Sequence, residues 1–263
     1  MQPITNLLIS ATRKAVKFLQ RDFLELEMLQ RTSSGNKGFC EKSYLKLKTL
    51  LQNELQRHLE SLFFPEDIFE IDNNNREVAF LVHPIDSTNN LARSIPFFAL
   101  SITYLKKIQE TLTAVSTVIH FPALNEIYYA EKGKGAWVER DSFNSINNKS
   151  ARLRVSGIAD LKNSLIVSDN LTDTPFPVTD VRAFGSPCYS AILLAAGKID
   201  IIYLSSLNYT LYHAFELIIK EAGGVVVNNN NKFIASNDHL KQALLRGYSK
   251  HHCEEAHRAD AAI

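Results

Sequence analysis

The stretch that decides the fold is VAFLVHPIDSTNNL, which runs from Val78 to Leu91. Its first five residues are continuously apolar, a pattern typical of a strand that is buried on both faces. The polar residues that begin at His83 follow without a break, so they are predicted to lie where this strand ends. Ser87 and Thr88 come next and are typical of a helix start, where hydroxyl groups cap free backbone N–H groups. The stretch therefore predicts a strand, a polar turn that contains Asp86, and a helix.

The residues on either side of this stretch predict helices before it and strands after it. Apolar residues at helical spacing predict an amphipathic helix within residues 1–23, and a second helical pattern follows the polar break at residues 32–38 and ends at Pro65. Three further strands are predicted at residues 97–104, 111–120 and 126–130. The turn at Gly133–Trp137 then returns the chain, so the strands are expected to form an antiparallel meander.

The second half of the chain alternates short strands with helices. Strands are predicted at residues 165–167, 199–203, 225–227 and 233–235, and helices at 186–196, 211–222 and 239–246. Residues 141–149 are polar and rich in asparagine, which indicates a loop or a boundary. We therefore expect an N-terminal half at 1–145 with the antiparallel sheet and the HPIDST motif, an α/β half at 146–250, and a frayed tail at 251–263.

Composition excludes several classes of function. The 263 residues include 45% hydrophobic residues, enough for a substantial core, and the formal net charge of +1 gives no broad surface for nucleic acid. Cys40, Cys188 and Cys253 lack the spacing of zinc ligands and are predicted to be reduced thiols in the cytoplasm. No apolar run is long enough for a membrane helix, so no membrane association is expected.

Several motifs, in order along the chain, carry a resemblance to a known family. They are Asp86–Leu91 with Ile95–Ile102, Asn125–Ala136, Arg182–Ser186, Ala195–Asp200 and Glu221–Val226. Together they resemble the inositol monophosphatase family, in its bacterial SuhB-like branch, over roughly residues 5–247. The resemblance implies an α/β (α+β) fold, a layered α/β/α/β/α sandwich of the inositol monophosphatase and sugar phosphatase type. It also implies a homodimer and a magnesium-dependent phosphatase site.

The resemblance also implies a set of carboxylates, which this chain keeps only in part. The family holds Mg²⁺ with a glutamate of a G-E-E segment, both aspartates of D-P-x-D and an aspartate of a W-D pair. Here Asp86 matches the second D-P-x-D aspartate, His83 replaces the first, and Leu211 replaces the aspartate of the W-D pair. The G-E-E glutamate is placed on Asp72. The candidate metal ligands are thus Asp86, Asp72 and His83 in a degenerate site.

The remaining candidate residues concern catalysis and phosphate. Thr88 and Asp72 are the candidate catalytic residues, and Ser87 and Thr88 are the candidate phosphate-binding residues, through backbone amides at a helix start. A simpler interpretation gives His83 a hydrogen bond in the vacated space and makes Asp86 a cap for the helix that follows.

Three functional readings follow. The favoured hypothesis is a catalytically impaired pseudoenzyme with weak or absent Mg²⁺ binding, which acts as a binding protein or scaffold for an unidentified protein partner. The alternative is an active metal-dependent phosphoric monoester hydrolase, acting on an inositol phosphate, sugar phosphate or nucleotide phosphate. It would use a rearranged site or a single transition metal at Asp72, His83 and Asp86. The third is a sensor that binds a small phosphorylated ligand at Ser87 and Thr88 without cleaving it.

Overall fold

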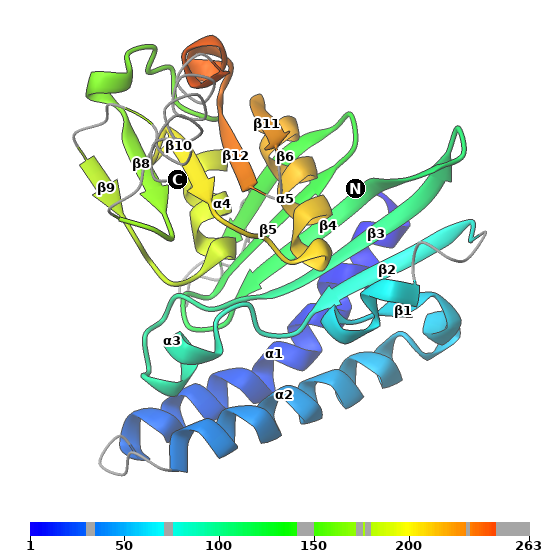
Figure 1. Ribbon diagram of the computed structural model, residues 1–263. Coiled ribbons are helices and arrows are strands. Elements are labelled where there is room, and N and C mark those ends of the chain that lie inside the picture. The colour runs from blue at the N-terminus through cyan, green and yellow to red at the C-terminus, as the bar shows by residue number, and fades with distance from the viewer. Residues whose placement is uncertain are drawn as a thin grey trace, which may run out of the picture.

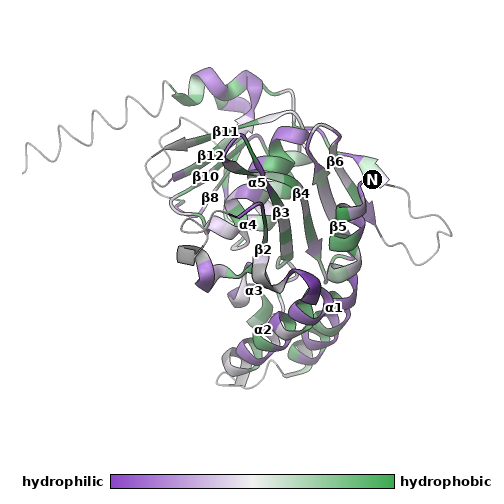
Figure 2. Cartoon of the chain, turned by 90° about the vertical axis from the view of Figure 1, so that its right-hand side faces the viewer, coloured by the Kyte–Doolittle hydropathy of each residue, from purple (hydrophilic) through white to green (hydrophobic). Residues whose placement is uncertain are grey.

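The computed structural model describes residues 1–29, 35–70, 76–140, 150–171, 176, 180–229 and 232–245. Two helices open the chain, α1 (Pro3–Leu29) and α2 (Gly35–Glu54). They pack against each other and are followed by the 3₁₀ turn η1 (Gln56–Ser61). Both helices alternate hydrophilic and hydrophobic positions (Figure 2), as an amphipathic helix that covers a sheet should.

The first sheet has seven strands in chain order. They are β1 (Leu62–Phe63), β2 (Val78–His83), β3 (Leu100–Ile108), β4 (Thr111–Phe121), β5 (Glu126–Glu131), β6 (Gly135–Arg140) and β7 (Ser150–Arg152). The pairs from β2 to β7 are antiparallel, which confirms the predicted meander. β1 pairs with β2 in parallel, so these two strands end at the same edge of the sheet.

The second sheet has the order β11-β12-β10-β8-β9. Its strands are β8 (Leu165–Ser168), β9 (Asp180–Arg182), β10 (Ile201–Leu204), β11 (Gly224–Asn229) and β12 (Lys232–Asn237). β8 runs parallel to both β9 and β10, whereas β12 is antiparallel to its two neighbours. Helices α4 (Pro187–Ala195) and α5 (Tyr209–Glu221) alternate with these strands along the chain, as predicted.

The elements stack in five layers (Figure 1). Helix α1 packs against β4 on one face of the first sheet, and α5 packs against β4 on the other. Helices α4 and α5 lie between the sheets, with α4 against β10 and α5 against β11. The outer face of the second sheet is covered by η3 (Leu161–Asn163), by η4 (Asp238–Leu240) and by the residues that follow η4. Their apolar side chains include Leu161, Leu240 and Leu244. The α/β/α/β/α sandwich is confirmed.

Strand β2 shows why its sequence is apolar without interruption. Ala79 and Leu81 belong to the core between the first sheet and α5, while Phe80 and Val82 belong to the core beneath α1 and α2. Successive side chains of a strand point to opposite faces, so a strand between two helix layers buries both sets. His83, the next residue, has the parity of Leu81 and faces the α5 layer.

Two of the predicted motifs lie together because α5 ends beside a hairpin. The Glu221 carboxylate accepts hydrogen bonds from the backbone N–H of Gly133, at 2.6 Å, and of Gly135, at 2.7 Å. Both glycines have positive φ, at 76° and 89°, which a residue with a side chain adopts only at a cost. The E-A-G-G and G-x-G motifs thus form one clasp between α5 and the β5–β6 turn.

Some predicted boundaries were wrong. The second helix ends at Glu54 rather than at Pro65, because the apolar residues that follow enter the sheet as β1 and are buried in the core. Helix α2 begins at Gly35, inside the predicted polar break. Strands β7 and β9 carry no apolar alternation and were not predicted. The predicted loop at 141–149 and tail at 251–263 lie outside the described residues.

Candidate functional site

The candidate site lies where β2 ends, beside the starts of α4 and α5. β2 ends at His83, and the turn that contains Asp86 leads into the short helix α3 (Thr88–Ala92). Antiparallel pairing places His83 opposite Ser101 of β3, and a hydrogen bond links His83 to Thr210 in α5. The predicted position of the HPIDST motif at a strand end is therefore confirmed.

Asp86 is held on both oxygens by the protein itself. Its Oδ1 accepts a hydrogen bond from the Ala99 backbone N–H at 2.7 Å. Its Oδ2 accepts one from the Ser186 hydroxyl at 2.5 Å and one from the Cys188 backbone N–H at 3.0 Å. Burial raises the pKa of Asp86 to about 6, although these hydrogen bonds favour the charged form and oppose that rise. Three of the carboxylate's roughly four lone-pair positions are therefore occupied.

These bonds make Asp86 a cap, but for a different helix from the one expected. Ser186 is the N-cap residue of α4, and its Oγ accepts a hydrogen bond from the Tyr189 N–H at 3.0 Å. Asp86 satisfies the Cys188 N–H in the same first turn. The expectation that Asp86 caps the helix after it was wrong. That helix, α3, begins after Ser87, whose side chain makes no capping bond.

His83 is a buried, neutral imidazole of defined tautomer. The residue is 9% exposed, and its Nδ1 is 2.8 Å from Thr210 Oγ1. The Thr210 hydroxyl donates its proton to Asn208 Oδ1 at 2.7 Å, so Nδ1 must carry the proton shared with Thr210. Nε2 therefore bears the lone pair. Burial lowers the pKa of His83 to about 4, and the charge of Glu66 opposes that change only partly.

The structure places the other predicted residues as follows. Leu211, at the position of the missing aspartate, is 2% exposed and belongs to the apolar core between the first sheet and α5. Thr88 is exposed and Ser87 is buried, at the start of an α3 of only five residues. Asp72 lies outside the described residues, so its assignment stays a prediction.

The sequence reasoning missed Glu66. This residue follows β1 within the turn η2 (Pro65–Glu70), much as Asp86 follows β2, and the parallel pairing of β1 with β2 brings the two ends to one edge. Glu66 lies close enough to His83 for its charge to favour the protonated imidazole. The signal available in the sequence was the acidic pair Glu66 and Asp67, which only Pro65 separates from the apolar run that ends at Phe64.

The two carboxylates and the imidazole at this edge do not suit a magnesium ion. Mg²⁺ requires several oxygen ligands in near-octahedral geometry. Both oxygens of Asp86 are bonded to the protein, both oxygens of Glu66 accept hydrogen bonds from α2, and the imidazole of His83 is a nitrogen ligand. Across the described residues, no group of three or more His, Cys, Asp or Glu side chains is arranged to hold a metal ion.

Asn90 joins two of the family motifs beside the site. Its side-chain amide donates to the carbonyl of Phe97 at 2.7 Å and to the carbonyl of Phe184 at 2.9 Å. Gly185 follows Phe184 with a φ of 70°, and a Cβ there would lie 3.0 Å from Asn90 Oδ1. The turn before α4 is therefore held against α3, which fixes Ser186 over Asp86.

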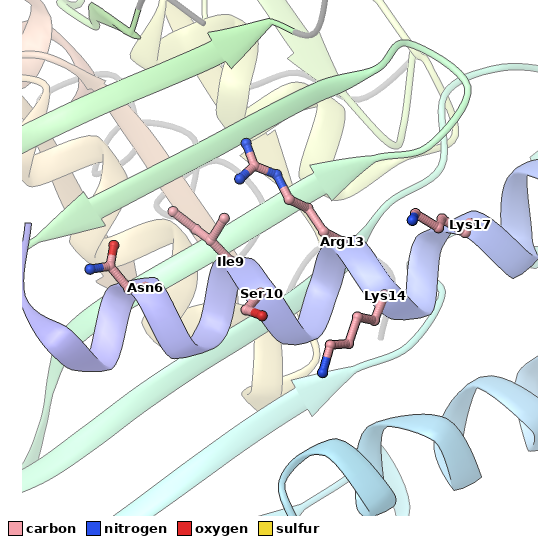
Figure 3. A pocket seen from close by; sticks show the side chains of 6 residues that line it. All are labelled: Asn6, Ile9, Ser10, Arg13, Lys14 and Lys17. Atoms are coloured by element: carbon pink, nitrogen blue, oxygen red, sulfur yellow. The ribbon is translucent and has the colours of Figure 1, made fainter.

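A hollow of about 380 Å³ lies elsewhere, on helix α1 (Figure 3). It is lined by Asn6, Ile9, Ser10, Arg13, Lys14 and Lys17. Arg13 is paired with Glu139 at 2.7 Å and Lys14 with Glu54 at 2.6 Å, so two of its three cations are neutralised. Since α1 and α5 cover opposite faces of the first sheet, this hollow is separate from the site at His83.

Comparison with known proteins agrees with this fold. The sequence matches the inositol monophosphatase family over residues 1–261. It is 27% identical to the inositol-1-monophosphatase of Mesorhizobium japonicum, over 94% of this chain and 96% of that protein. It is 26% identical to the Nus factor SuhB of Vibrio cholerae, over 87% of this chain and 86% of that protein. The crystal structure of SuhB from Bartonella henselae superposes with a TM-score of 0.72 at 24% identity, covering 94% of this chain and 98% of that one.

The fold and the strand-end motif thus define an α/β/α/β/α protein of the phosphatase type. The chain belongs to the inositol monophosphatase family. Members of this family typically depend on Mg²⁺ and are often dimeric. Among the described helices of this chain, none is both long enough and apolar enough to cross a membrane.

Proposed function

We propose that this chain is a catalytically impaired member of its family that acts by binding rather than by turnover. The observation that carries the proposal is the core position of Leu211, which is 2% exposed where the family has a metal-binding aspartate. An alkyl side chain supplies no ligand, and the space around it is filled by apolar neighbours. The state of Asp86 and His83 supports the same conclusion.

The chemistry of phosphate ester hydrolysis explains why these changes matter. In metal-assisted hydrolysis, Mg²⁺ activates the attacking water and neutralises charge on the phosphate and on the leaving oxygen. An ion does this only while open carboxylate oxygens hold it. Here Asp86 Oδ1 accepts a hydrogen bond from the Ala99 N–H and Oδ2 accepts two from the start of α4, while His83 directs its protonated nitrogen at Thr210. We derive no catalytic step through a metal at this site.

The proposed role is that of a scaffold in the cytoplasm, working as a homodimer with a protein partner. The names of several relatives support this direction, because proteins 23–26% identical to this chain are named Nus factors in Vibrio cholerae and Escherichia coli. The dimeric state that is frequent in the family supports the homodimer. A phosphorylated small molecule remains the proposed ligand class for any residual binding at Ser87 and Thr88.

The test is a phosphatase assay on the full-length protein. Inositol, sugar and nucleotide monophosphates are each offered with Mg²⁺, Mn²⁺ or Zn²⁺, and the Mesorhizobium japonicum enzyme serves as the positive control. The expected result is phosphate release at the buffer rate with every combination.

Turnover that depends on the site would overturn the proposal. Asp86→Ala is the direct variant, but it also removes a cap of α4, so His83→Asn is assayed beside it. A wild-type rate well above buffer that both folded variants reduce establishes an active, rearranged phosphatase. Activity that survives both changes belongs to a contaminating enzyme and leaves the proposal standing.

A further inference from the structure

Helices α1 and α2 run side by side (Figure 1) and carry a cluster of cations around one aromatic ring. Phe18 is half-buried on α1, and the Lys46 ammonium of α2 lies 3.7 Å from its ring centroid. The Arg21 guanidinium lies beside the same ring, 5.2 Å from the centroid. Lys17 lies four residues before Arg21, and Lys42 four before Lys46, so each shares a helix face with its neighbour. These four cations form the basic cluster.

The carboxylates near the basic cluster do not balance its charge. Its three lysines are exposed, and none of them forms an ion pair with another described residue. Arg21 reaches Asp22 at 3.5 Å, but that carboxylate is buried. Glu25, one turn after Arg21, adds one exposed carboxylate, while Glu54 is already paired with Lys14 at 2.6 Å. The basic cluster therefore keeps an excess of positive charge.

Exposed apolar side chains continue the same face of α1 beyond the cluster. Leu24 follows Arg21 by three residues and is 61% exposed, and Met28 follows Leu24 by four and is 87% exposed. Burial of these two side chains against another molecule would be favourable. The surface from Lys17 to Met28 is thus basic at one end and apolar at the other, over about 16 Å of helix.

We propose that this surface docks the protein partner, and that the segment of the partner that binds there is acidic with apolar side chains at one end. Carboxylates of the partner would supply the acceptors that the lysines lack, and its apolar end would pack on Leu24 and Met28. This inference rests on the proposed function, because it names the class of partner for a chain that acts by binding.

An acidic protein segment fits this surface better than a nucleic acid or a membrane does. Nucleic acid is held through many phosphates on a broad basic surface, whereas this chain has a formal net charge of +1. Two ion pairs, Arg13 with Glu139 and Lys14 with Glu54, also border the cluster. A helix that lies on a membrane buries an apolar face along its length, whereas here basic and apolar residues follow one another along one face.

The experiment measures peptide binding to the full-length protein by fluorescence anisotropy. The probe is a labelled peptide of about 15 residues, enough to span this surface as a helix, with glutamates in one half and leucines at helical spacing in the other. The control peptide has lysine in place of every glutamate. Only the acidic peptide is expected to bind at low salt, and its binding should weaken as salt is raised.

Two triple variants separate this surface from net charge. The first changes the lysines of the basic cluster together, as Lys17→Gln, Lys42→Gln and Lys46→Gln. It is expected to bind the acidic peptide about tenfold more weakly than wild type. The matched control removes the same charge from exposed lysines of β3, of the turn after β5 and of the turn after α4, as Lys106→Gln, Lys132→Gln and Lys198→Gln. It is expected to bind as wild type.

A double variant tests the apolar end of the surface. Leu24→Ser combined with Met28→Ser should weaken binding about tenfold without changing its salt dependence, because it removes apolar burial and no charge. Circular dichroism establishes that every variant is folded.

Three outcomes would overturn the inference. The first is no binding of the acidic peptide by wild type, and the second is equal weakening by both triple variants, which means that net charge governs binding. The third is tighter binding of single-stranded RNA or of phosphatidylglycerol vesicles through the same lysines, which assigns the surface to another class of partner. The phosphatase assay does not depend on this surface, so each of these results leaves the proposed function standing. Site-dependent phosphate release, with peptide binding intact, overturns the proposed function alone.

Discussion

Replacing Leu211 with aspartate restores a family carboxylate, and the structure predicts that the chain will not tolerate it. Leu211 is 2% exposed on α5, which packs against β2, β3 and β4. Removing a buried leucine side chain costs about 2–5 kcal/mol. A carboxyl group kept neutral at pH 7 by an apolar site, with its pKa moved from about 3.9 to 7 or above, adds about 4 kcal/mol.

The expected loss is therefore about 6–9 kcal/mol, which is comparable to the whole stability of many domains. Leu211→Asp should be largely unfolded, or should melt at least about 15 °C below wild type. Urea denaturation at pH 7, followed by circular dichroism in EDTA and in Mg²⁺, measures this. Because Asp86 and His83 are already bonded to the protein, Mg²⁺ is expected to restore little of the loss.

Two controls separate charge from volume and from position. Leu211→Asn removes the same volume without a carboxylate, and should lose about 2–5 kcal/mol. Leu45→Asp places the same charge on a residue that is 62% exposed, and should change stability by less than about 0.5 kcal/mol. A Leu211→Asp protein as stable as wild type, or one that Mg²⁺ returns to wild-type stability, would refute the reading of this position as core.

Three further changes test other parts of the structure. The pKa of His83 is about 4 in the folded chain and about 6.5 in the unfolded chain, so protonation favours unfolding. About 3 kcal/mol of the free energy of unfolding is therefore present above pH 6.5 and is lost as pH falls to 4. His83→Gln should flatten that fall in denaturation curves measured from pH 7.5 to 4. Glu221→Ala leaves two turn N–H groups unpaired and should cost about 2 kcal/mol in urea denaturation. Gly224→Ala should lower the melting temperature, at a cost of about 1–3 kcal/mol, because its Cβ would lie 2.7 Å from Ile219 Cγ2 and 2.9 Å from Ser236 O. Wild-type behaviour of any of these variants would contradict the contact it tests.

The fold was predictable because its strongest signals are local. The apolar run at Val78–Val82 predicts a strand that is buried on both faces, and in the structure this strand lies between the layers of α1 and α5. The wrong boundaries have the same physical origin. Leu55 continues the helical pattern of α2. A helix, a 3₁₀ turn and a strand that pack on the same core all bury apolar residues, so an apolar residue does not distinguish between them. Periodicity alone therefore could not place the end of α2 at Glu54.

The sequence could predict where the site residues lie, but not which hydrogen bonds they form. His83 and Asp86 lie in one motif at a strand end, so their neighbourhood followed from the sequence. The partners of Asp86 lie 13 and about 100 residues away, at Ala99, Ser186 and Cys188. Glu66 was missed because β1 has only two residues, too few for a periodic signal. A parallel pairing across the intervening turn then brings Glu66 to His83.

The same bonds explain which carboxylate this chain keeps. Asp86 ties the β2 turn to the start of α4, so its loss would leave the N–H groups of Ala99 and Cys188 without their acceptor. A carboxylate at position 211 would have no comparable structural role. Without a metal it would lie unpaired in an apolar core, whereas leucine there contributes about 2 kcal/mol of apolar burial. Once a metal is not required, a buried leucine at position 211 is more stable than an aspartate would be, and Asp86 remains because the start of α4 depends on it.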